Sequence, residues 1–143
     1  IVGTKSGDFC DAVEARIAAL GLVEQVCWTG FVADRDRLYG DIDILVAPAV
    51  DEPFGLTVAE AGAYGLPVVA ARSGAFPELV EDGRTGLLFT PGDAADLARS
   101  LERLALDADL RRRLGSAGRE RVASTFTIDA MTEHFLEACA TSR

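Results

Sequence analysis

The chain of 143 residues is long enough for one domain, and 49% of its residues are hydrophobic, which is enough to bury a core. Its formal net charge of -9 argues against nucleic acid and anionic membrane surfaces as partners, because both reward clustered Lys and Arg, and Lys5 is the only lysine. No apolar stretch approaches the roughly twenty residues of a membrane span and no basic leader precedes an apolar run, so we expect a cytoplasmic protein.

Apolar runs bounded by turn residues alternate with segments of helical period, which is the pattern of repeated β-α units around a parallel sheet. Five such runs are the predicted strands: 1–3, 25–29, 43–47, 67–71 and 86–89. Between the first two, Val13, Ile17 and Leu20 share one helical face, and Gly21 follows as a stop signal. The pattern predicts an α/β fold that begins with a β-α-β unit.

Short helical connections are predicted in the middle of the chain. One covers 34–39 and a second ends at Tyr64. The segment 73–77 leads into a third, which continues through Val80. Each of these connections is brief, as expected between neighbouring strands of one sheet.

Three longer helices are predicted after the last strand. Asp93, which follows the turn at 91–92, is the expected N-cap of the first. Their apolar faces are predicted from residues at helical spacing: Leu97, Leu101 and Leu104; Leu110, Leu114 and Val122; and Met131, Phe135 and Cys139. The arginine run 111–113 is interpreted as a solvated helix face and not as a ligand site, because it lies far in sequence from every strand end, where such folds bind ligands.

The segment 52–60, with the sequence EPFGLTVAE, places two glutamates eight positions apart between a predicted strand and a helix. A strand end, a glycine loop and a helix start offer backbone N–H groups that suit a phosphate, and carboxylates accept hydrogen bonds from sugar hydroxyls. The segment therefore predicts a nucleotide-sugar site. Thr57 and Glu60 also have the spacing of a capping box, in which the carboxylate only caps the helix, and spacing alone leaves both interpretations open.

Several segments in a fixed order resemble the C-terminal half of the family 4 (group 1) retaining glycosyltransferases. These segments span nearly the whole chain: 43–49, 52–65, 66–70, 81–88 and 91–93. Their core is the E-x7-E motif of 52–60. The resemblance implies the GT-B architecture, in which two Rossmann-like domains face each other across a cleft. Residues 1–143 would form one domain, the C-terminal one that binds the donor nucleotide, with a parallel sheet flanked by helices.

The resemblance also implies a role for each glutamate. Glu60 resembles the glutamate that accepts both ribose hydroxyls, and Glu52 resembles the one that reaches the transferred sugar, which makes it the expected catalytic residue. The residues between them resemble a loop whose backbone amides meet the sugar and the diphosphate: Phe54, Gly55, Leu56 and Thr57. The missing Cβ of Gly55 permits close approach of the backbone, and Pro53 keeps Glu52 out of helical φ/ψ.

Two further loops are weaker donor-site candidates. Gly30 and Phe31, at the end of the second predicted strand, could contact the nucleobase, although Phe31 is equally consistent with a core residue. Ser73 and Gly74 match a family position near the donor, although Ser73 could instead cap the following helix. Arg72 either supplies positive charge to the donor or pairs with a nearby carboxylate.

The resemblance implies transfer of a glycosyl group from a nucleotide diphosphate sugar to an acceptor hydroxyl, with retention at the anomeric carbon. We expect no cofactor and no metal, since family members require no bound ion and the chain has no acidic-pair metal motif. The expected partners are the nucleotide-sugar donor and an N-terminal acceptor-binding domain of the same parent chain.

The chain begins at what resembles the second strand of the family's domain. The first strand, with the Arg and Lys that grip the diphosphate, is therefore expected to be missing from residues 1–143, and this fragment alone is expected to be inactive. Its absence should leave unpaired strand edges.

Two other function classes stay open. A sugar-nucleotide epimerase shares the two-domain architecture, but it needs additional acid and base residues facing the cleft. A non-catalytic doubly wound binding module, as in signalling receivers, relies on acidic residues after the first strand, where this chain has Thr4, Lys5 and Ser6.

Overall fold

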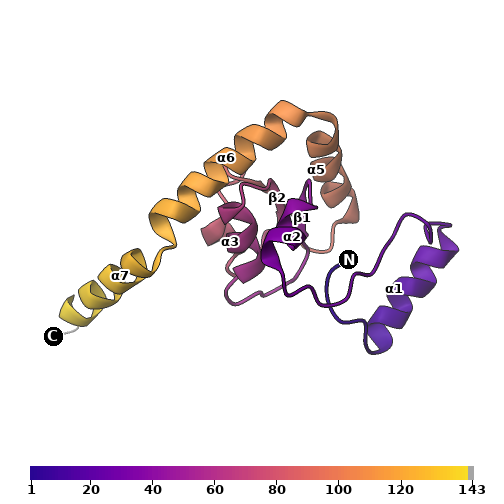
Figure 1. Ribbon diagram of the computed structural model, residues 1–143, viewed down its shortest axis with the longest axis horizontal. Helices are drawn as coiled ribbons and strands as arrows, with labels where there is room; N and C mark the ends of the chain where they lie inside the picture. The colour runs from indigo at the N-terminus through magenta and orange to yellow at the C-terminus, as the bar shows by residue number, and fades with distance from the viewer. Residues whose placement is uncertain (142–143) are drawn as a thin grey trace. The chain divides into compact units, whose positions relative to one another are not determined.

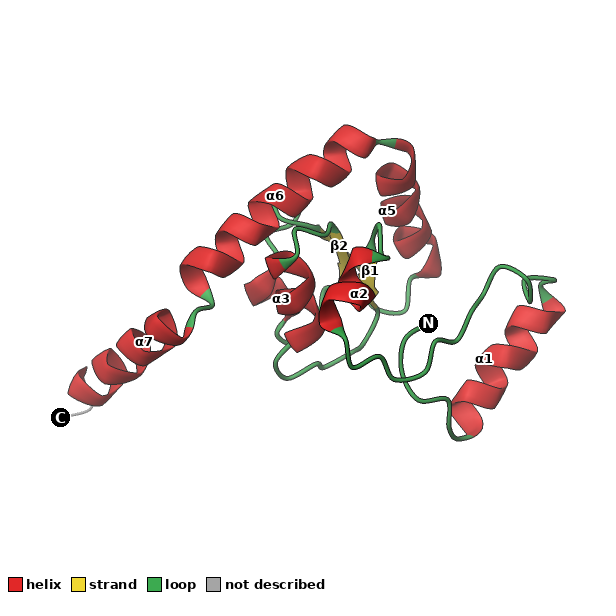
Figure 2. Ribbon diagram, in the orientation of Figure 1, coloured by secondary structure: helices red, strands yellow, loops and turns green. Residues whose placement is uncertain are grey.

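The computed structural model describes residues 1–141, which group into two compact units along the chain. The first unit covers residues 1–38, and the second begins at Tyr39. Figure 1 labels the helices and strands, and Figure 2 shows short strands among longer helices. Each unit is described by itself.

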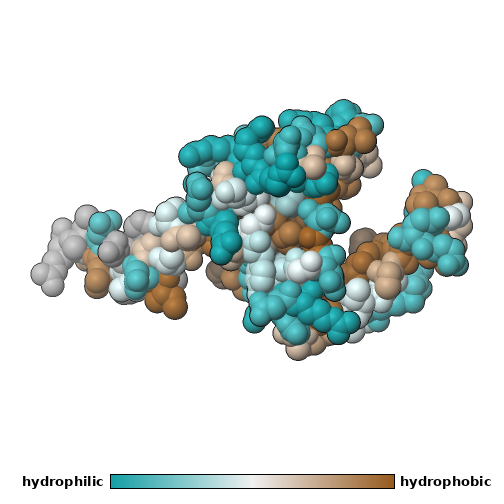
Figure 3. Space-filling view, turned by 45° about the horizontal axis from the view of Figure 1, so that its top comes forward, coloured by the Kyte–Doolittle hydropathy of each residue, from teal (hydrophilic) through white to brown (hydrophobic). Residues whose placement is uncertain are grey.

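The first unit contains α1 (Asp8–Ala19), the helix predicted from its apolar spacing. The helix also ends as predicted, because Gly21 follows it with a φ of 69°. The Gly21 amide donates to the Ala18 carbonyl at 3.0 Å, and the Leu22 amide donates to the Ile17 carbonyl at 3.0 Å. This pair of bonds is the helix stop that a left-handed glycine provides. Figure 3 shows apolar surface, in brown, over this unit.

The two extended segments of the first unit lie side by side, as a β-α-β unit requires. The Gly3 amide donates to the Gly30 carbonyl at 3.0 Å, but the pairing gives only isolated bridges among the described residues. The predicted strands 1–3 and 25–29 are therefore wrong as regular strands. The second segment begins in a turn whose amides donate to Leu22, and a pairing of two short segments supports no long ladder.

After α2 (Arg35–Gly40), the described part of the second unit forms a parallel sheet of three strands in the order β1-β2-β3. The strands are β1 (Leu45–Ala47), β2 (Val68–Ala71) and β3 (Leu87–Phe89). Leu45 lies opposite Val68, and Val69 lies opposite Leu87. The three predictions for these strands are confirmed, with slightly later starts.

Helices cover both faces of this sheet. The crossover helices are α3 (Leu56–Ala63), between β1 and β2, and α4 (Phe76–Leu79), between β2 and β3. The next helix, α5 (Ala94–Leu106), packs against β3 and β2. Figure 1 shows α3 and α5 on opposite sides of the strands. Every residue of β2 is buried, which is what a parallel strand covered on both faces requires.

The long helix α6 (Ala108–Thr125) packs closely on α3, and glycines make this approach possible. A Cβ at Gly115 would collide with the carbonyl oxygen of Gly65, and a Cβ at Gly62 would lie 2.8 Å from the Val122 side chain. These two contacts explain why glycine occupies positions 62 and 115 inside helices, where it is otherwise unfavourable.

The predicted helix ends in this part of the chain are largely confirmed. The Asp93 carboxylate accepts from the Ala95 and Asp96 amides at 3.0 Å, so it is the N-cap of α5. The interpretation of the arginine run as wholly solvated is wrong for Arg111, which donates to the Leu104 carbonyl at 2.5 Å and thereby caps the end of α5.

The last helix is α7 (Ile128–Thr141), and its prediction is confirmed. The side chains of Met131 and Phe135, on which that prediction partly depended, lie outside the described residues, and Cys139 is exposed. No helix in the described part of the chain has the length and apolar content needed to cross a membrane.

Candidate functional site

Gly55 links the loop after β1 to the start of α3. It stands at the N-cap with a φ of 71°, a left-handed conformation that glycine adopts without strain. A Cβ at this position would lie 3.3 Å from the Phe76 ring and would collide with Leu79. The missing Cβ of Gly55 therefore permits α4 to pack closely against the loop. The side of Gly55 where a Cβ would extend faces α4, so it is not open to a ligand.

Glu52 is half-buried, and its carboxylate turns back onto this loop. Its Oε1 accepts from the Gly55 amide at 3.0 Å and from the Phe54 amide at 3.4 Å. These are two of the amides expected to meet the donor, and that contact stays a prediction. The amides of Leu56 and Thr57, which begin α3, have no acceptor among the described residues. The helix start therefore presents N–H groups and the positive end of the helix dipole.

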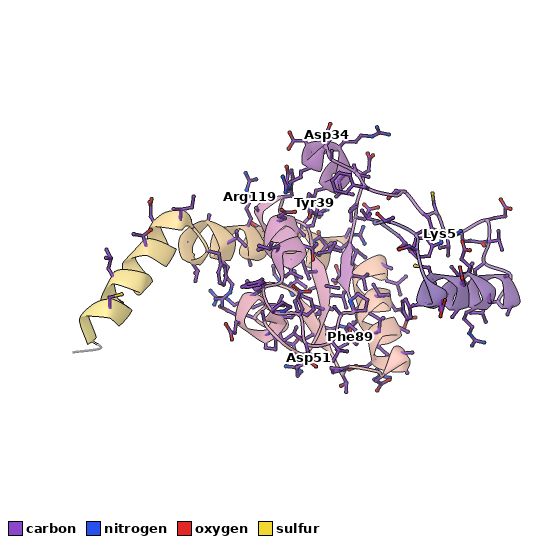
Figure 4. The ribbon with its side chains drawn as sticks, turned by 90° about the horizontal axis from the view of Figure 1, so that it is seen from below. Lys5, Asp34, Tyr39, Asp51, Phe89 and Arg119 are labelled. Carbon is purple, nitrogen blue, oxygen red and sulfur yellow. The ribbon has the colours of Figure 1, made fainter. Side chains whose placement is uncertain are left out.

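Glu60 is half-buried in the second turn of α3, where its Oε2 accepts from the Tyr39 hydroxyl at 2.7 Å. Tyr39 is only 4% exposed, and its ring stacks on Tyr64 with centroids 4.9 Å apart (Tyr39 is labelled in Figure 4). The capping-box interpretation is wrong, because the N-cap is Gly55 and Thr57 already lies inside the helix.

Ser73 and Gly74, which follow β2, lie against the Glu52 loop. The Ser73 hydroxyl accepts from the Asp51 amide at 3.0 Å and donates to Asp51 Oδ1 at 3.1 Å. The Ala75 amide donates to the Glu52 carbonyl at 2.9 Å, and a Cβ at Gly74 would lie 2.7 Å from Glu52 N. The Ser73 side chain thus connects the loop after β2 to the loop after β1. It does not cap a helix, since Ala75 stands at the N-cap of α4.

Sequence reasoning missed Tyr39 and Asp51 as parts of this site. Asp51 has a φ of 58°, a left-handed conformation that Asp tolerates better than most residues. Its position directly before a Glu-Pro pair at a strand end is a turn signal that could have pointed to it. The signal for Tyr39 is weaker: a buried tyrosine usually finds a polar partner for its hydroxyl.

The remaining candidates belong to other segments of the chain. Gly30 and Phe31 belong to the first unit, and their part in the site stays a prediction; Phe31 is 82% exposed, so the core alternative is wrong. Arg72 Nη2 lies 2.5 Å from Asp82 Oδ2, which confirms the ion-pair interpretation.

Among the described residues, no group of three or more His, Cys, Asp and Glu side chains is placed to hold a metal.

Solved structures with the same fold define the class of protein. HepE from Anabaena, solved in complex with UDP and glucose, superposes with a TM-score of 0.86 at 30% identity, over 98% of this chain and 39% of that chain. Sucrose-phosphate synthase from Thermosynechococcus elongatus superposes with a TM-score of 0.84 at 33% identity, over 99% of this chain and 38% of that chain. The fold is the Rossmann-like fold of the GT-B glycosyltransferases.

The family follows from the sequence. The profile of the family described as "Glycosyl transferases group 1" matches residues 1–121, and the chain belongs to this family. The lipopolysaccharide core biosynthesis glycosyltransferase LpsE from Rhizobium meliloti is 31% identical over 134 residues, which is 94% of this chain. The chain spans 39% of the length of LpsE.

Proposed function

We propose that this chain is the donor-binding domain of a retaining glycosyltransferase, which transfers a sugar from a nucleotide diphosphate sugar to an acceptor hydroxyl. The observation that carries the proposal is the loop between β1 and α3, where Glu52 accepts from the Gly55 amide directly before the start of α3 and Glu60 follows within that helix. The complex of HepE with UDP and glucose supports this donor class, since that protein has the same fold.

The proposed mechanism is electrostatic. As the glycosidic bond of the donor breaks, negative charge builds up on the departing diphosphate. The amides of Leu56 and Thr57 and the positive end of the α3 dipole would stabilise that charge without having to reorganise. Glu52 and Glu60 would orient the sugar and the ribose by accepting hydrogen bonds, and neither acts as a nucleophile.

The proposed partner is an N-terminal acceptor-binding domain of the same protein. The chain spans 39% of the length of LpsE, which leaves room for such a domain in a protein of that size. We propose that this partner domain carries the acceptor site. The absence of a metal and a cofactor, and a cytoplasmic location, also stay predictions. An epimerase or a non-catalytic module is less favoured, because the family comprises glycosyltransferases.

Calorimetric titration with UDP, GDP and ADP tests the proposal in the protein that carries this chain. We expect one of these nucleotides to bind, and Glu60→Ala to weaken its binding about 10- to 100-fold, because hydrogen bonds to a charged group contribute about 1.5 to 3 kcal/mol. Glu102→Ala is the matched control: this glutamate is exposed on α5. The proposal fails if the unmodified protein binds none of the three nucleotides.

A further inference from the structure

We propose that Tyr39 is a positioning residue. Its hydroxyl holds the Glu60 carboxylate in the orientation that accepts the ribose hydroxyls, and it thereby sets the preference for ribonucleotides over nucleotides that lack those hydroxyls. This inference rests on the proposed function. It adds a residue outside α3 that orients Glu60 for binding the ribose hydroxyls.

The contact between the two side chains is short and sheltered. The distance of 2.7 Å from the Tyr39 hydroxyl to Glu60 Oε2 is that of a well-formed O–H···O bond, and a carboxylate acceptor makes such a bond stronger than a neutral one. Tyr39 is 4% exposed, so water competes little for the hydroxyl. The bond therefore restricts the Glu60 carboxylate more than a surface contact would.

The tyrosine is itself held in place. Its ring stacks on Tyr64, with an angle of 26° between the ring planes and 4.9 Å between the centroids. Tyr39 lies in α2, before β1, whereas Glu60 lies in the second turn of α3 and Tyr64 just beyond its end. The stack and the hydrogen bond thus join the segments on either side of β1. A glutamate held from another element loses fewer rotamers when it binds a ligand, which is the benefit of preorganisation.

The test separates the hydroxyl from the ring. Tyr39→Phe keeps an aromatic ring for the stack and removes the hydroxyl that donates to Glu60. We expect this variant to weaken binding of the preferred ribonucleoside diphosphate about tenfold. It should leave binding of the corresponding 2′,3′-dideoxynucleoside diphosphate unchanged, because that ligand has no hydroxyl for Glu60 to accept. In a Glu60→Ala background, Tyr39→Phe should have no further effect.

Val58→Ala is the control for a general loss of stability. Val58 is a buried residue of α3, and its apolar side chain forms no hydrogen bond with Glu52 or Glu60. We expect it to lower the melting temperature and to leave the ratio of ribonucleotide to dideoxynucleotide affinity unchanged. A Tyr39→Phe variant that binds both nucleotides as the unmodified protein does, or that weakens both equally, overturns the inference.

The same titrations distinguish the inference from the proposed function. If the unmodified protein binds no nucleotide, or if Glu60→Ala has no effect, the proposed role of Glu60 is wrong and the inference is overturned with it. If Glu60→Ala abolishes the discrimination while Tyr39→Phe preserves it, the donor site stands and only the positioning role of Tyr39 is wrong.

Discussion

At the residue scale, Gly74 shows how tightly the two loops of the site meet. Its φ of 55° lies in the left-handed region, and the space where a Cβ would extend is filled by the backbone of Glu52. Glu52 N would be 2.7 Å from that Cβ, and a backbone atom cannot move aside as a flexible side chain can. The position of the catalytic candidate therefore depends on a neighbour that has no side chain.

Gly74→Ala should lower the free energy of unfolding by about 2 to 3 kcal/mol, because it adds a collision with Glu52 to the strain of a left-handed alanine. Gly83→Ala is the matched control, since Gly83 has a φ of 77° and open space around its Cβ position. It should cost only the strain, about 1 kcal/mol. Urea unfolding measures both, and equal losses would show that the collision with Glu52 relaxes at no cost.

At the element scale, a second carboxylate stabilises the start of α5 beside the predicted N-cap Asp93. Asp96 Oδ2 accepts from the Thr90 amide at 2.8 Å, and Asp96 Oδ1 lies 3.1 Å from Arg99 Nη2. The hydrogen bond from the Thr90 backbone and then the Thr90 side chain hold the pKa of Asp96 below its usual value of 3.8. Burial opposes them, and Arg99 adds a smaller lowering effect.

Because the folded state lowers this pKa, ionised Asp96 stabilises the fold at every pH above the usual value of 3.8, and the contribution is lost as pH falls through the lowered pKa. Asp96→Asn should therefore lower the melting temperature at pH 7. The two proteins should converge as the pH is lowered below the pKa of folded Asp96. Melting curves from pH 7 to about pH 2 check this. Asp109→Asn, at an exposed carboxylate of α6, should show a smaller difference, and an equal one would contradict the assigned role of Thr90.

At the scale of the whole second unit, Arg121 of α6 joins that helix to the end of α4 and to the segment that follows α4. Its Nε donates to the Leu79 carbonyl at 3.1 Å, its Nη2 donates to the Glu78 carbonyl at 2.7 Å, and its Nη1 pairs with the Glu81 carboxylate. The guanidinium also lies over the Phe126 ring, 5.5 Å from its centroid. One side chain thus joins segments about forty positions apart.

Arg121→Gln should lower the free energy of unfolding by about 2 kcal/mol, because the Leu79 and Glu78 carbonyls and the Glu81 carboxylate lose a charged donor. Arg119→Gln, at the exposed arginine two positions earlier (labelled in Figure 4), should change it by less than about 0.5 kcal/mol. Chemical unfolding of both variants checks the difference. Equal effects would mean that the loss reflects charge and not the ties to the Leu79 and Glu78 carbonyls.

Local pattern predicted much of this second unit. The strands at 45–47, 68–71 and 87–89, the helices between and after them, and the cap at Asp93 depend on apolar spacing and turn chemistry within a few residues. The strands expected at 1–3 and 25–29 failed for the opposite reason. Whether an apolar run becomes a strand depends on a partner that supplies a ladder of hydrogen bonds, and the local pattern does not contain that partner.

The sequence by itself determined the alternation of strands and helices, the family to which the chain belongs, and the two glutamates with the loop between them, because each is written in neighbouring residues. Only the tertiary structure decided where those side chains point. Glu52 turns back onto the Gly55 amide, Ser73 and Gly74 lie against its loop, and Tyr39 reaches Glu60 from another helix. Tyr39 and Glu60 are 21 positions apart in the chain, and the local pattern around either residue does not contain the other.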